Sequence, residues 1–293
     1  MYSFEHYIHF VDGQITQQNL PNNVEADEHT LTFKYGEPIQ LHVVLDVHEE
    51  MTLQYIFEDN THAEIIETRN VSDEAVLNRE FKIGKSAHIN IFNENNGQGH
   101  NTYKDIGHSL SDSYLQLGYS ELSDGSIDAS YQFDLDGEGA DVRLRMAALS
   151  KDKEKKHYKV HIKHNAPHTT GIMDNYGVAK DSGHLVIDGI GTITKGQSGS
   201  ASHQTNKIIV FDPDCYASAN PFLYIDEYDV QASHAAGVGK MDEDHLYYLQ
   251  SRGLTKRQAM QLITYGYLMP VVEVVDNKMI KERFEMALSK VGA

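Results

Sequence analysis

The sequence of 293 residues has a single cysteine, Cys215, and few basic side chains. One cysteine excludes both an internal disulfide and a four-cysteine metal site within one chain. Lysine and arginine total 25 against 43 aspartate and glutamate residues, giving a formal net charge of −18. Such a charge repels a phosphate backbone, so a general nucleic-acid binder is excluded. The remaining composition, 40% hydrophobic and 23% charged, is typical of a folded globular chain.

Targeting and nucleotide-binding signals are also missing. The first residues, MYSFEHYIHFVDGQ, contain no basic segment followed by an apolar one, so we expect no signal peptide. No window approaches the roughly 20 apolar residues of a transmembrane helix, which predicts a cytoplasmic protein without membrane insertion. The chain has no Walker A, G-x-G-x-x-G, H-E-x-x-H or G-x-S-x-G sequence. We therefore expect no nucleotide site of its own.

Alternation of apolar and polar residues dominates the chain from Ile39 to Leu223. In residues 127–135, every odd position is apolar and every even position is polar, which is the pattern of a half-buried β-strand. Turn signals such as Asn95-Asn96-Gly97 and Asp188-Gly189 separate these runs. We expect a helix-free β body, although spacing alone leaves a sandwich, a barrel and a β-solenoid open. No fixed-period repeat is visible, which argues mildly against a regular solenoid.

The C-terminal segment changes to helical spacing. Three helices are predicted, over residues 243–252, from the capping box Thr255–Gln258 onward, and over residues 278–291. Asp242 is expected to cap the first helix and Gly253 to end it. Pro270 should end or kink the second.

These boundaries divide the chain into three parts. They are an N-terminal arm or cap (1–30), a β body (31–229) and a C-terminal helical module (230–293). The module has an apolar face formed by Leu246, Leu249, Leu262 and Ile263. Because the ends of solenoids need covers, this face predicts that the helices close the open end of the β body.

Two side chains are candidates for chemistry. Cys215 follows the apolar run 208–211, and its neighbours Asp212 and Asp214 would raise the pKa of the thiol if close. His234 lies among small residues that allow a second surface to approach. A small structural cysteine and an ordinary surface histidine are the simpler explanations on the residues alone. The stretch between the two is close in length to one coil of many solenoids, which would place them on adjacent coils, within reach of one metal ion.

Histidines gather between residues 157 and 168, at positions 157, 161, 164 and 168. A zinc site there is one interpretation, but His157 and His161 would share a strand face that His164 would not. No nearby cysteine completes a known zinc pattern, and some clustering is expected among 17 histidines. The acidic residues of 226–229 indicate a solvated face rather than a pair of catalytic carboxylates.

A long motif runs from Ser233 to Leu254 with the sequence SHAAGVGKMDEDHLYYLQSRGL. Three shorter motifs precede it: LDGEGA at 135–140, HNAPHTT at 164–170 and QTN at 204–206. Together they resemble the SufB/SufD family, the scaffold proteins of Suf-type iron–sulfur cluster assembly. The resemblance covers about residues 135–266. The chain is shorter than typical members, and we expect it to lack their N-terminal helical region.

The resemblance implies a right-handed parallel β-helix with a small C-terminal helical domain. It also implies a cytoplasmic complex with an ABC-type ATPase, SufC, which docks on the C-terminal helices and hydrolyses ATP. This chain would then be an assembly scaffold and not an enzyme. The residues that the resemblance places at the docking surface are Asp242, Leu246, Tyr247, Leu249, Arg252, Lys256 and Arg257.

Two positions carry over from the family to this chain. Counted from Pro221, Cys215 falls on the scaffold cysteine of the SufB branch, and His234 falls on the histidine that both branches share. The SufB branch has glutamates where this chain has Ser233 and Ala235. The chain therefore combines features of the two branches.

Three functions remain open at this point. The leading hypothesis is a scaffold subunit on which Cys215 and His234 hold a transient iron–sulfur cluster. A two-iron centre needs four protein ligands, which a homodimer or a heterodimer with a SufB/SufD paralogue would supply. The alternative is a SufD-like structural or iron-supply subunit that binds the ATPase but carries no cluster. A carbohydrate-active enzyme with clustered carboxylates would leave the C-terminal motif unexplained.

Overall fold

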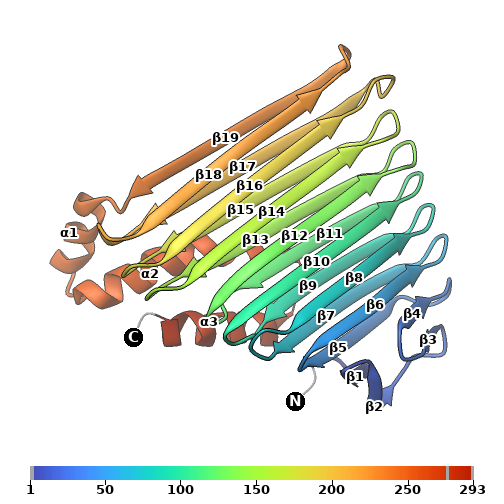
Figure 1. Cartoon of the computed structure of the whole chain (residues 1–293), viewed down its shortest axis with the longest axis horizontal. Helices are drawn as coiled ribbons and strands as arrows, with labels where there is room; N and C mark the ends of the chain where they lie inside the picture. Colours follow the sequence, from blue (N-terminus) through green and yellow to red (C-terminus); the bar gives the residue numbers. More distant parts are fainter. Residues whose placement is uncertain (1–2, 275–276, 292–293) are drawn as a thin grey trace.

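The computed structural model describes residues 3–274 and 277–291 of the chain. Two sheets face each other along the molecule, and the chain alternates between them from one strand to the next (Figure 1). Neighbouring strands within each sheet are parallel, except in two N-terminal hairpins. This architecture is a β-solenoid, which confirms the fold that the resemblance implies.

The first sheet contains β1 (Tyr7–Val11), β2 (Gln14–Asn19), β5 (Ile39–Val47), β7 (His62–Val71), β9 (His88–Asn95), β11 (Tyr114–Glu121), β13 (Asp141–Ser150), β15 (Thr170–Ala179), β17 (Ser200–Val210) and β19 (Val230–Lys240). The second contains β3 (Val24–Ala26), β4 (Thr30–Phe33), β6 (Glu50–Phe57), β8 (Val76–Ile83), β10 (His100–Ser109), β12 (Ser126–Leu135), β14 (Lys155–His164), β16 (His184–Ile193) and β18 (Tyr216–Ile225). No helix interrupts residues 39–223, as the periodicity predicts.

The length of the coils explains why the sequence shows no fixed repeat. In the first sheet, Ile39 of one coil pairs with Ala63 of the next. Near the other end of the solenoid, His184 pairs with Tyr216 in the second sheet, so a coil there contains more residues than a coil near the N-terminus. Because coil length increases along most of the chain, equivalent residues keep a constant spacing only over a few neighbouring coils, as from Glu50 to Val76 and Thr102.

Side chains fill the space between the two sheets. Along β12, the odd-numbered residues from Ile127 to Leu135 are buried, whereas Asp128 and Ser130 are exposed. In the N-terminal coils the interior is aromatic, and the rings of Phe33 and Phe57 stack with centroids 4.5 Å apart. Each coil thus extends the core of the previous one, as in other solenoid proteins.

The helices follow the last strand and are α1 (Glu243–Ser251), α2 (Lys256–Leu268), the 3₁₀ helix η1 (Met269–Val274) and α3 (Lys278–Val291). The helix-capping residues predicted from the sequence are present at the expected positions. The carboxylate of Asp242 accepts hydrogen bonds at the start of α1, and Thr255 forms a capping box with Gln258. Gly253 ends α1 with a φ of +96°. None of the helices within the described residues is long and apolar enough to cross a membrane.

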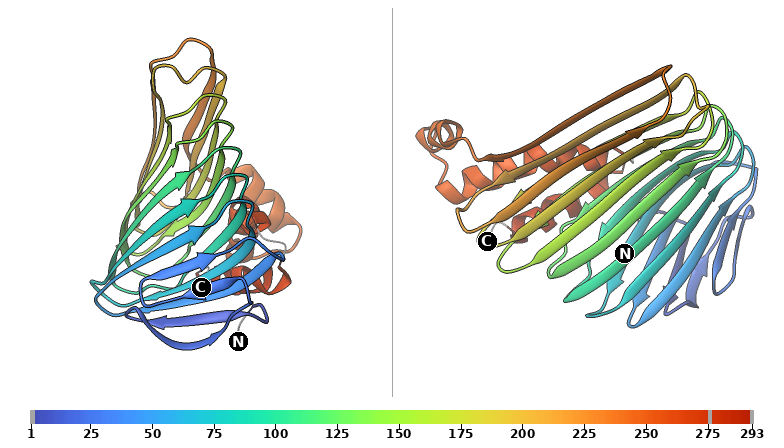
Figure 2. Two further views of the ribbon diagram at one scale, coloured as in Figure 1. Left: turned by 90° about the vertical axis from the view of Figure 1, so that its right-hand side faces the viewer. Right: turned by 45° about the horizontal axis from the view of Figure 1, so that its top comes forward.

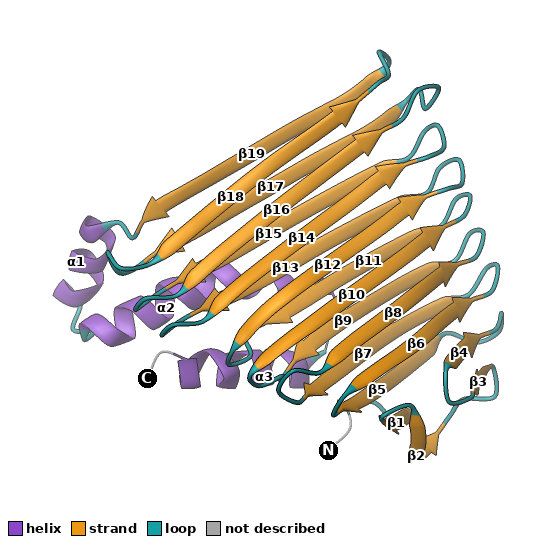
Figure 3. Ribbon diagram, in the orientation of Figure 1, coloured by secondary structure: helices purple, strands orange, loops and turns teal. Residues whose placement is uncertain are grey.

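The helical module covers one side of the solenoid and leaves its C-terminal end open (Figures 2 and 3). Val271, Val272 and Phe284 pack against Phe92 and Ala147, which lie on the outer face of the first sheet. The prediction that the module closes the open end is therefore corrected. The reason is that the middle strands of this sheet carry outward-facing apolar side chains, which give the helices an apolar surface to bury.

Candidate functional site

The last coil of the solenoid, formed by β18 and β19, has no further coil above it (Figure 1). Every residue of β19 from Gln231 to Lys240 is exposed. The strand has the sequence VQASHAAGVGK, which contains one formally charged residue, Lys240, and mostly small side chains. A long, exposed edge strand of this kind presents unpaired backbone groups to which another strand can bind.

His234 lies in β19 at the mouth of the solenoid interior. It pairs with Gln204 of β17, whose Nε2 donates a hydrogen bond across the interior to the carbonyl of Phe222 at 2.8 Å. Paired residues of parallel strands share a face of the sheet, so His234 also faces inward. Its ring takes part in none of the hydrogen bonds found among residues 3–274 and 277–291. This imidazole is therefore available to a ligand.

Cys215 lies in the turn between β17 and β18 as a half-buried free thiol. Its S–H donates to the carbonyl of Asp181 at 3.6 Å. Burial raises the pKa of the thiol, and the carboxylates of Asp212 and Asp181 add to this effect against two backbone hydrogen bonds. The effect predicted for Asp212 is confirmed. The thiol is protonated at neutral pH, so it needs a bound cation to become a thiolate ligand.

The structure does not place Cys215 and His234 on adjacent coils. The residue one coil before His234 is Gln204 of β17, and not a residue of the turn that carries Cys215. Gln204 bonds to Phe222, which is seven residues from Cys215. At about 3.3 Å per residue, the two side chains lie roughly 23 Å apart along the strands. The expected proximity within one chain is wrong because a coil at this end of the solenoid is longer than the segment from Cys215 to His234.

The residues expected to dock an ATPase lie in α1, at its N-cap and C-cap, and at the start of α2. Helix α1 has no buried residue, and Asp242 is engaged as its N-cap. Tyr247 is 74% exposed. The guanidinium carbon of Arg252 lies 5.1 Å from the ring centroid of Tyr248. The apolar Leu246 and Leu249 of the same helix are half-buried.

Lys256 and Arg257 begin α2 and are exposed. Both line a cavity of about 380 Å³ between the helical module and the turns of the solenoid. Asp212, from the turn that carries Cys215, and Asp181, which accepts the hydrogen bond of that thiol, line the same cavity. The start of α2 and the cysteine turn are thus neighbours across one cavity.

The histidines of residues 157–168 do not converge on a common point. The ring of His157 contacts Asp188 at 2.7 Å, and that of His161 contacts Thr192 at 3.0 Å. His164 lies inside the solenoid, where burial lowers its pKa to about 4. Among the described residues, three metal-ligating side chains come within 4.8 Å of one another only at His108, Asp134 and Asp136. The sequence analysis did not identify that group.

The family model described as "SUF system FeS cluster assembly, SufBD core domain" matches residues 37–267. The chain belongs to the SufB/SufD family. The match begins well before the motifs at 135–266, so the N-terminal coils of this SufB/SufD-family chain belong to the same core domain.

Two relatives carry the name "Iron-sulfur cluster assembly protein SufD". The relative from Bacillus subtilis (strain 168) is 28% identical over 300 residues, covering 92% of this chain and 69% of the relative. The relative from Escherichia coli (strain K12) is 24% identical over 208 residues, covering 70% of this chain and 48% of the relative. A SufBD family protein of Mycobacterium tuberculosis (strain H37Rv) is 29% identical over 137 residues, covering 47% of this chain and 16% of that protein. These matches identify a subunit of a Suf-type iron–sulfur assembly system.

Proposed function

We propose that this SufB/SufD-family chain is a scaffold subunit on which a nascent iron–sulfur cluster is built at the open end of the solenoid. A SufC-like ABC-type ATPase binds α1 and the start of α2 and hydrolyses ATP, while this chain carries out no catalysis itself. The observation that supports the proposal is the exposed β19 edge, where the ring of His234 has no hydrogen-bond partner within the described part of the chain.

A twofold dimer brings together the two ligands that one chain keeps apart. Two identical edge strands related by a twofold axis pair antiparallel. Twofold symmetry places one residue opposite its own copy, and if that residue is Val238, His234 lies opposite Asp242, next to Met241. Met241 is seven residues after His234, and Cys215 is seven residues before Phe222, which lies across the interior from the partner strand of His234. Met241 and Cys215 therefore lie at about the same position along the strands. The pairing therefore brings the histidine of one copy to the level of the cysteine of the other.

The side chains of such a dimer fit a cluster. Two copies offer two thiols and two imidazoles, which is the number of ligands that a two-iron centre requires. Iron binding displaces the thiol proton and overcomes the raised pKa of Cys215. A heterodimer with a SufB or SufD paralogue uses the same edge and supplies different ligands.

The second candidate is a SufD-like structural or iron-supply subunit that binds the ATPase but holds no cluster. The raised pKa of the Cys215 thiol favours it, as do the SufD names of the relatives from Bacillus subtilis and Escherichia coli. Only the first candidate predicts that the complex contains iron and sulfide, so measuring both separates the two candidates.

Cys215→Ser is expected to abolish the iron and sulfide content of the complex, because a hydroxyl does not replace a thiolate as a cluster ligand. The chain is produced anaerobically with a SufC-type ATPase, and the purified complex is assayed for iron, sulfide and visible absorbance. His234→Ala should also lose most of the iron. His100→Ala, which removes an exposed histidine of β10, should leave it unchanged. A stable complex without iron, indifferent to Cys215→Ser, would support the second candidate instead.

Charge reversal at the start of α2 is expected to weaken ATPase binding about tenfold for Lys256→Glu or Arg257→Glu, as for charges at the rim of an interface. Neither change should unfold the helix, since acidic residues stabilise a helix N-terminus. Titration of the ATPase against each variant measures the affinity, and circular dichroism checks the fold. Lys278→Glu, at the start of α3, serves as the control. Unchanged affinity in both variants would remove these residues from the interface.

A further inference from the structure

The group formed by His108, Asp134 and Asp136 lies on the outer face of the second sheet, away from the helical module. His108 is in β10 and pairs in register with Asp134 of β12, one coil further along the chain. Asp136 follows the end of β12. One ring nitrogen of His108 and one carboxylate oxygen of each aspartate all lie within 4.8 Å of one another. Parallel pairing of successive coils thus assembles three ligands from two strands.

Pairs of histidine and aspartate recur on this face, but only this pair gains a third ligand among the described residues. His157 contacts Asp188 at 2.7 Å, and no other acidic or histidine side chain joins that pair to form a group of three. His108 contacts Asp136 at the same distance of 2.7 Å, and Asp134 completes the group. The pair His157–Asp188 is therefore a matched comparison without the third ligand.

The burial of Asp134 is a second and independent observation. This side chain is only 8% exposed although it lies on the outer face of a sheet. The amides of Gln132 and Asn165 donate to its carboxylate at 3.0 and 3.4 Å. No ion pair within 4.0 Å among the described residues includes Asp134, and its register neighbour Lys163 makes none. A carboxylate with so little exposure and no ion-pair partner gains from a nearby positive charge, which a bound cation would supply.

The amides that contact the two aspartates also hold them in place. Asn165 donates to Asp136 at 2.8 Å as well as to Asp134. Hydrogen bonds of this kind orient ligating carboxylates in metal sites. His108 and Asp136 have half and about one third of their side chains exposed (50% and 31%), so an ion bound there would keep contact with solvent.

We propose that His108, Asp134 and Asp136 bind one divalent first-row transition-metal ion, such as Mn²⁺, Fe²⁺ or Zn²⁺. The imidazole favours these ions over Mg²⁺ and Ca²⁺, which prefer oxygen ligands alone, and the two carboxylates supply charge. Solvent completes the coordination, so the ion exchanges readily. This site is separate from Cys215 and His234 and does not depend on the function proposed for them.

The test is Mn²⁺ binding, counted by electron paramagnetic resonance of the free ion in the presence of excess Mg²⁺. The full chain carries Cys215→Ser and His234→Ala, so that the last coil contributes no ligands and the result is independent of cluster assembly. We expect one bound Mn²⁺ per chain. His108→Ala or Asp134→Asn should weaken binding 10- to 100-fold, whereas His157→Ala should leave it unchanged.

Asp134→Asn also separates ligand loss from misfolding. Without metal, this variant should resist urea at least as well as its parent, because it removes a negative charge that lies within 4.8 Å of the Asp136 carboxylate. Absence of a bound Mn²⁺ in the parent would overturn the proposal. An equal loss of binding in His157→Ala and His108→Ala would overturn it too, since the binding would then belong to scattered surface histidines.

Discussion

Replacing Arg79 with methionine is expected to lower the free energy of unfolding by about 3–5 kcal/mol. Arg79 lies on β8 inside the solenoid and is 1% exposed. Its Nε donates to Asp105 at 2.9 Å, its Nη2 contacts the same carboxylate, and its Nη1 contacts Glu67. Methionine fills part of the space but leaves two buried carboxylates without a cation. Urea unfolding followed by tyrosine signals measures the loss, since the chain has 17 tyrosines and no tryptophan.

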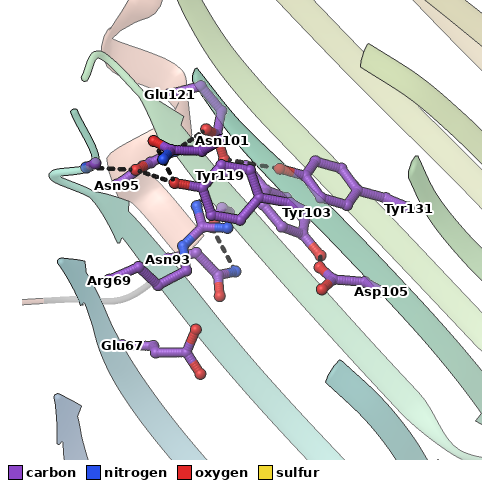
Figure 4. Close-up of polar contacts among 12 residues, drawn as sticks. Glu67, Arg69, Asn93, Asn95, Asn101, Tyr103, Asp105, Tyr119, Glu121 and Tyr131 are labelled. Atoms are coloured by element: carbon purple, nitrogen blue, oxygen red, sulfur yellow. Dashed lines mark hydrogen bonds and ion pairs between the residues drawn. The ribbon is translucent and has the colours of Figure 1, made fainter. Parts of the chain in front are cut away.

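The cost is large because the carboxylates that Arg79 contacts belong to a wider network between the sheets, whose members Asp105, Tyr119 and Glu121 are shown in Figure 4. Tyr119 donates to Asp105 at 2.6 Å, which is one of the two carboxylates that Arg79 contacts. In the same region, Arg69 and Tyr131 donate to Glu121 at 2.6 and 3.0 Å. Deleting a charged member of this network leaves the charge of its partner where water cannot reach it.

The pKa of Glu121 shows how its surroundings favour the charged form. Burial raises this pKa, but the charge of Arg69 and the hydrogen bonds from Asn95, Arg69 and Tyr131 outweigh burial and lower it overall. The carboxylate therefore stays ionised inside the solenoid. Its negative charge is balanced by the guanidinium of Arg69, which is also fully buried. Removing a cation from such surroundings exposes the full cost of the buried negative charge.

Two variants make the Arg79 result specific. Arg143→Met removes a guanidinium that is 44% exposed and bonded to Asp141, and it should cost less than about 1 kcal/mol. The double variant Arg79→Met, Asp105→Asn should be more stable than Arg79→Met alone, because it removes one of the unpaired charges. A small and equal cost at Arg79 and Arg143 would contradict the idea that the buried network stabilises the solenoid.

The same network marks the limit of what periodicity can predict. On β12 the inward residues are apolar and the outward ones polar, so alternation identifies both the strand and its buried face. On β7 the inward residues include Glu67 and Arg69, while Ile66 points outward under the helical module. Local sequence cannot show that a charged residue faces inward, because its partners come from coils far away in the chain.

Coil length and the position of the helices were equally inaccessible from local patterns. The helix caps at Asp242 and Thr255 are local hydrogen bonds, and they were predicted correctly. The surface that the helices cover depends on side chains such as Phe92, which lies many coils earlier in the sequence. For the same reason, Cys215 and His234 were identified from motifs, but their separation required the register of β17 and β19. Likewise, the metal-ligating group on β10 and β12 becomes visible only once the pairing of these strands is known.

Val238→Lys is expected to weaken self-association of the chain at least 30-fold, equivalent to about 2 kcal/mol. In the proposed pairing, Val238 of one copy lies opposite Val238 of the other, so the two introduced lysines face each other across the twofold axis. Like charges on adjacent paired strands repel, and a charged side chain on an edge strand prevents pairing with another edge. Val238 is 46% exposed in the single chain, so the fold itself should tolerate lysine. Sedimentation velocity over a concentration series measures the change.

Leu110→Lys is the control, because Leu110 is also a large exposed apolar residue, at 40%, but lies in a turn away from the β19 edge. It should leave self-association unchanged. A dimer that persists in Val238→Lys would place the interface elsewhere on the molecule. A parent chain that remains monomeric at micromolar concentration would contradict the homodimer, and the same substitution would then be tested against a SufB or SufD paralogue. In the proposed dimer, Cys215 and His234 meet only through this edge, so loss of the dimer should also abolish the iron and sulfide content expected of the complex.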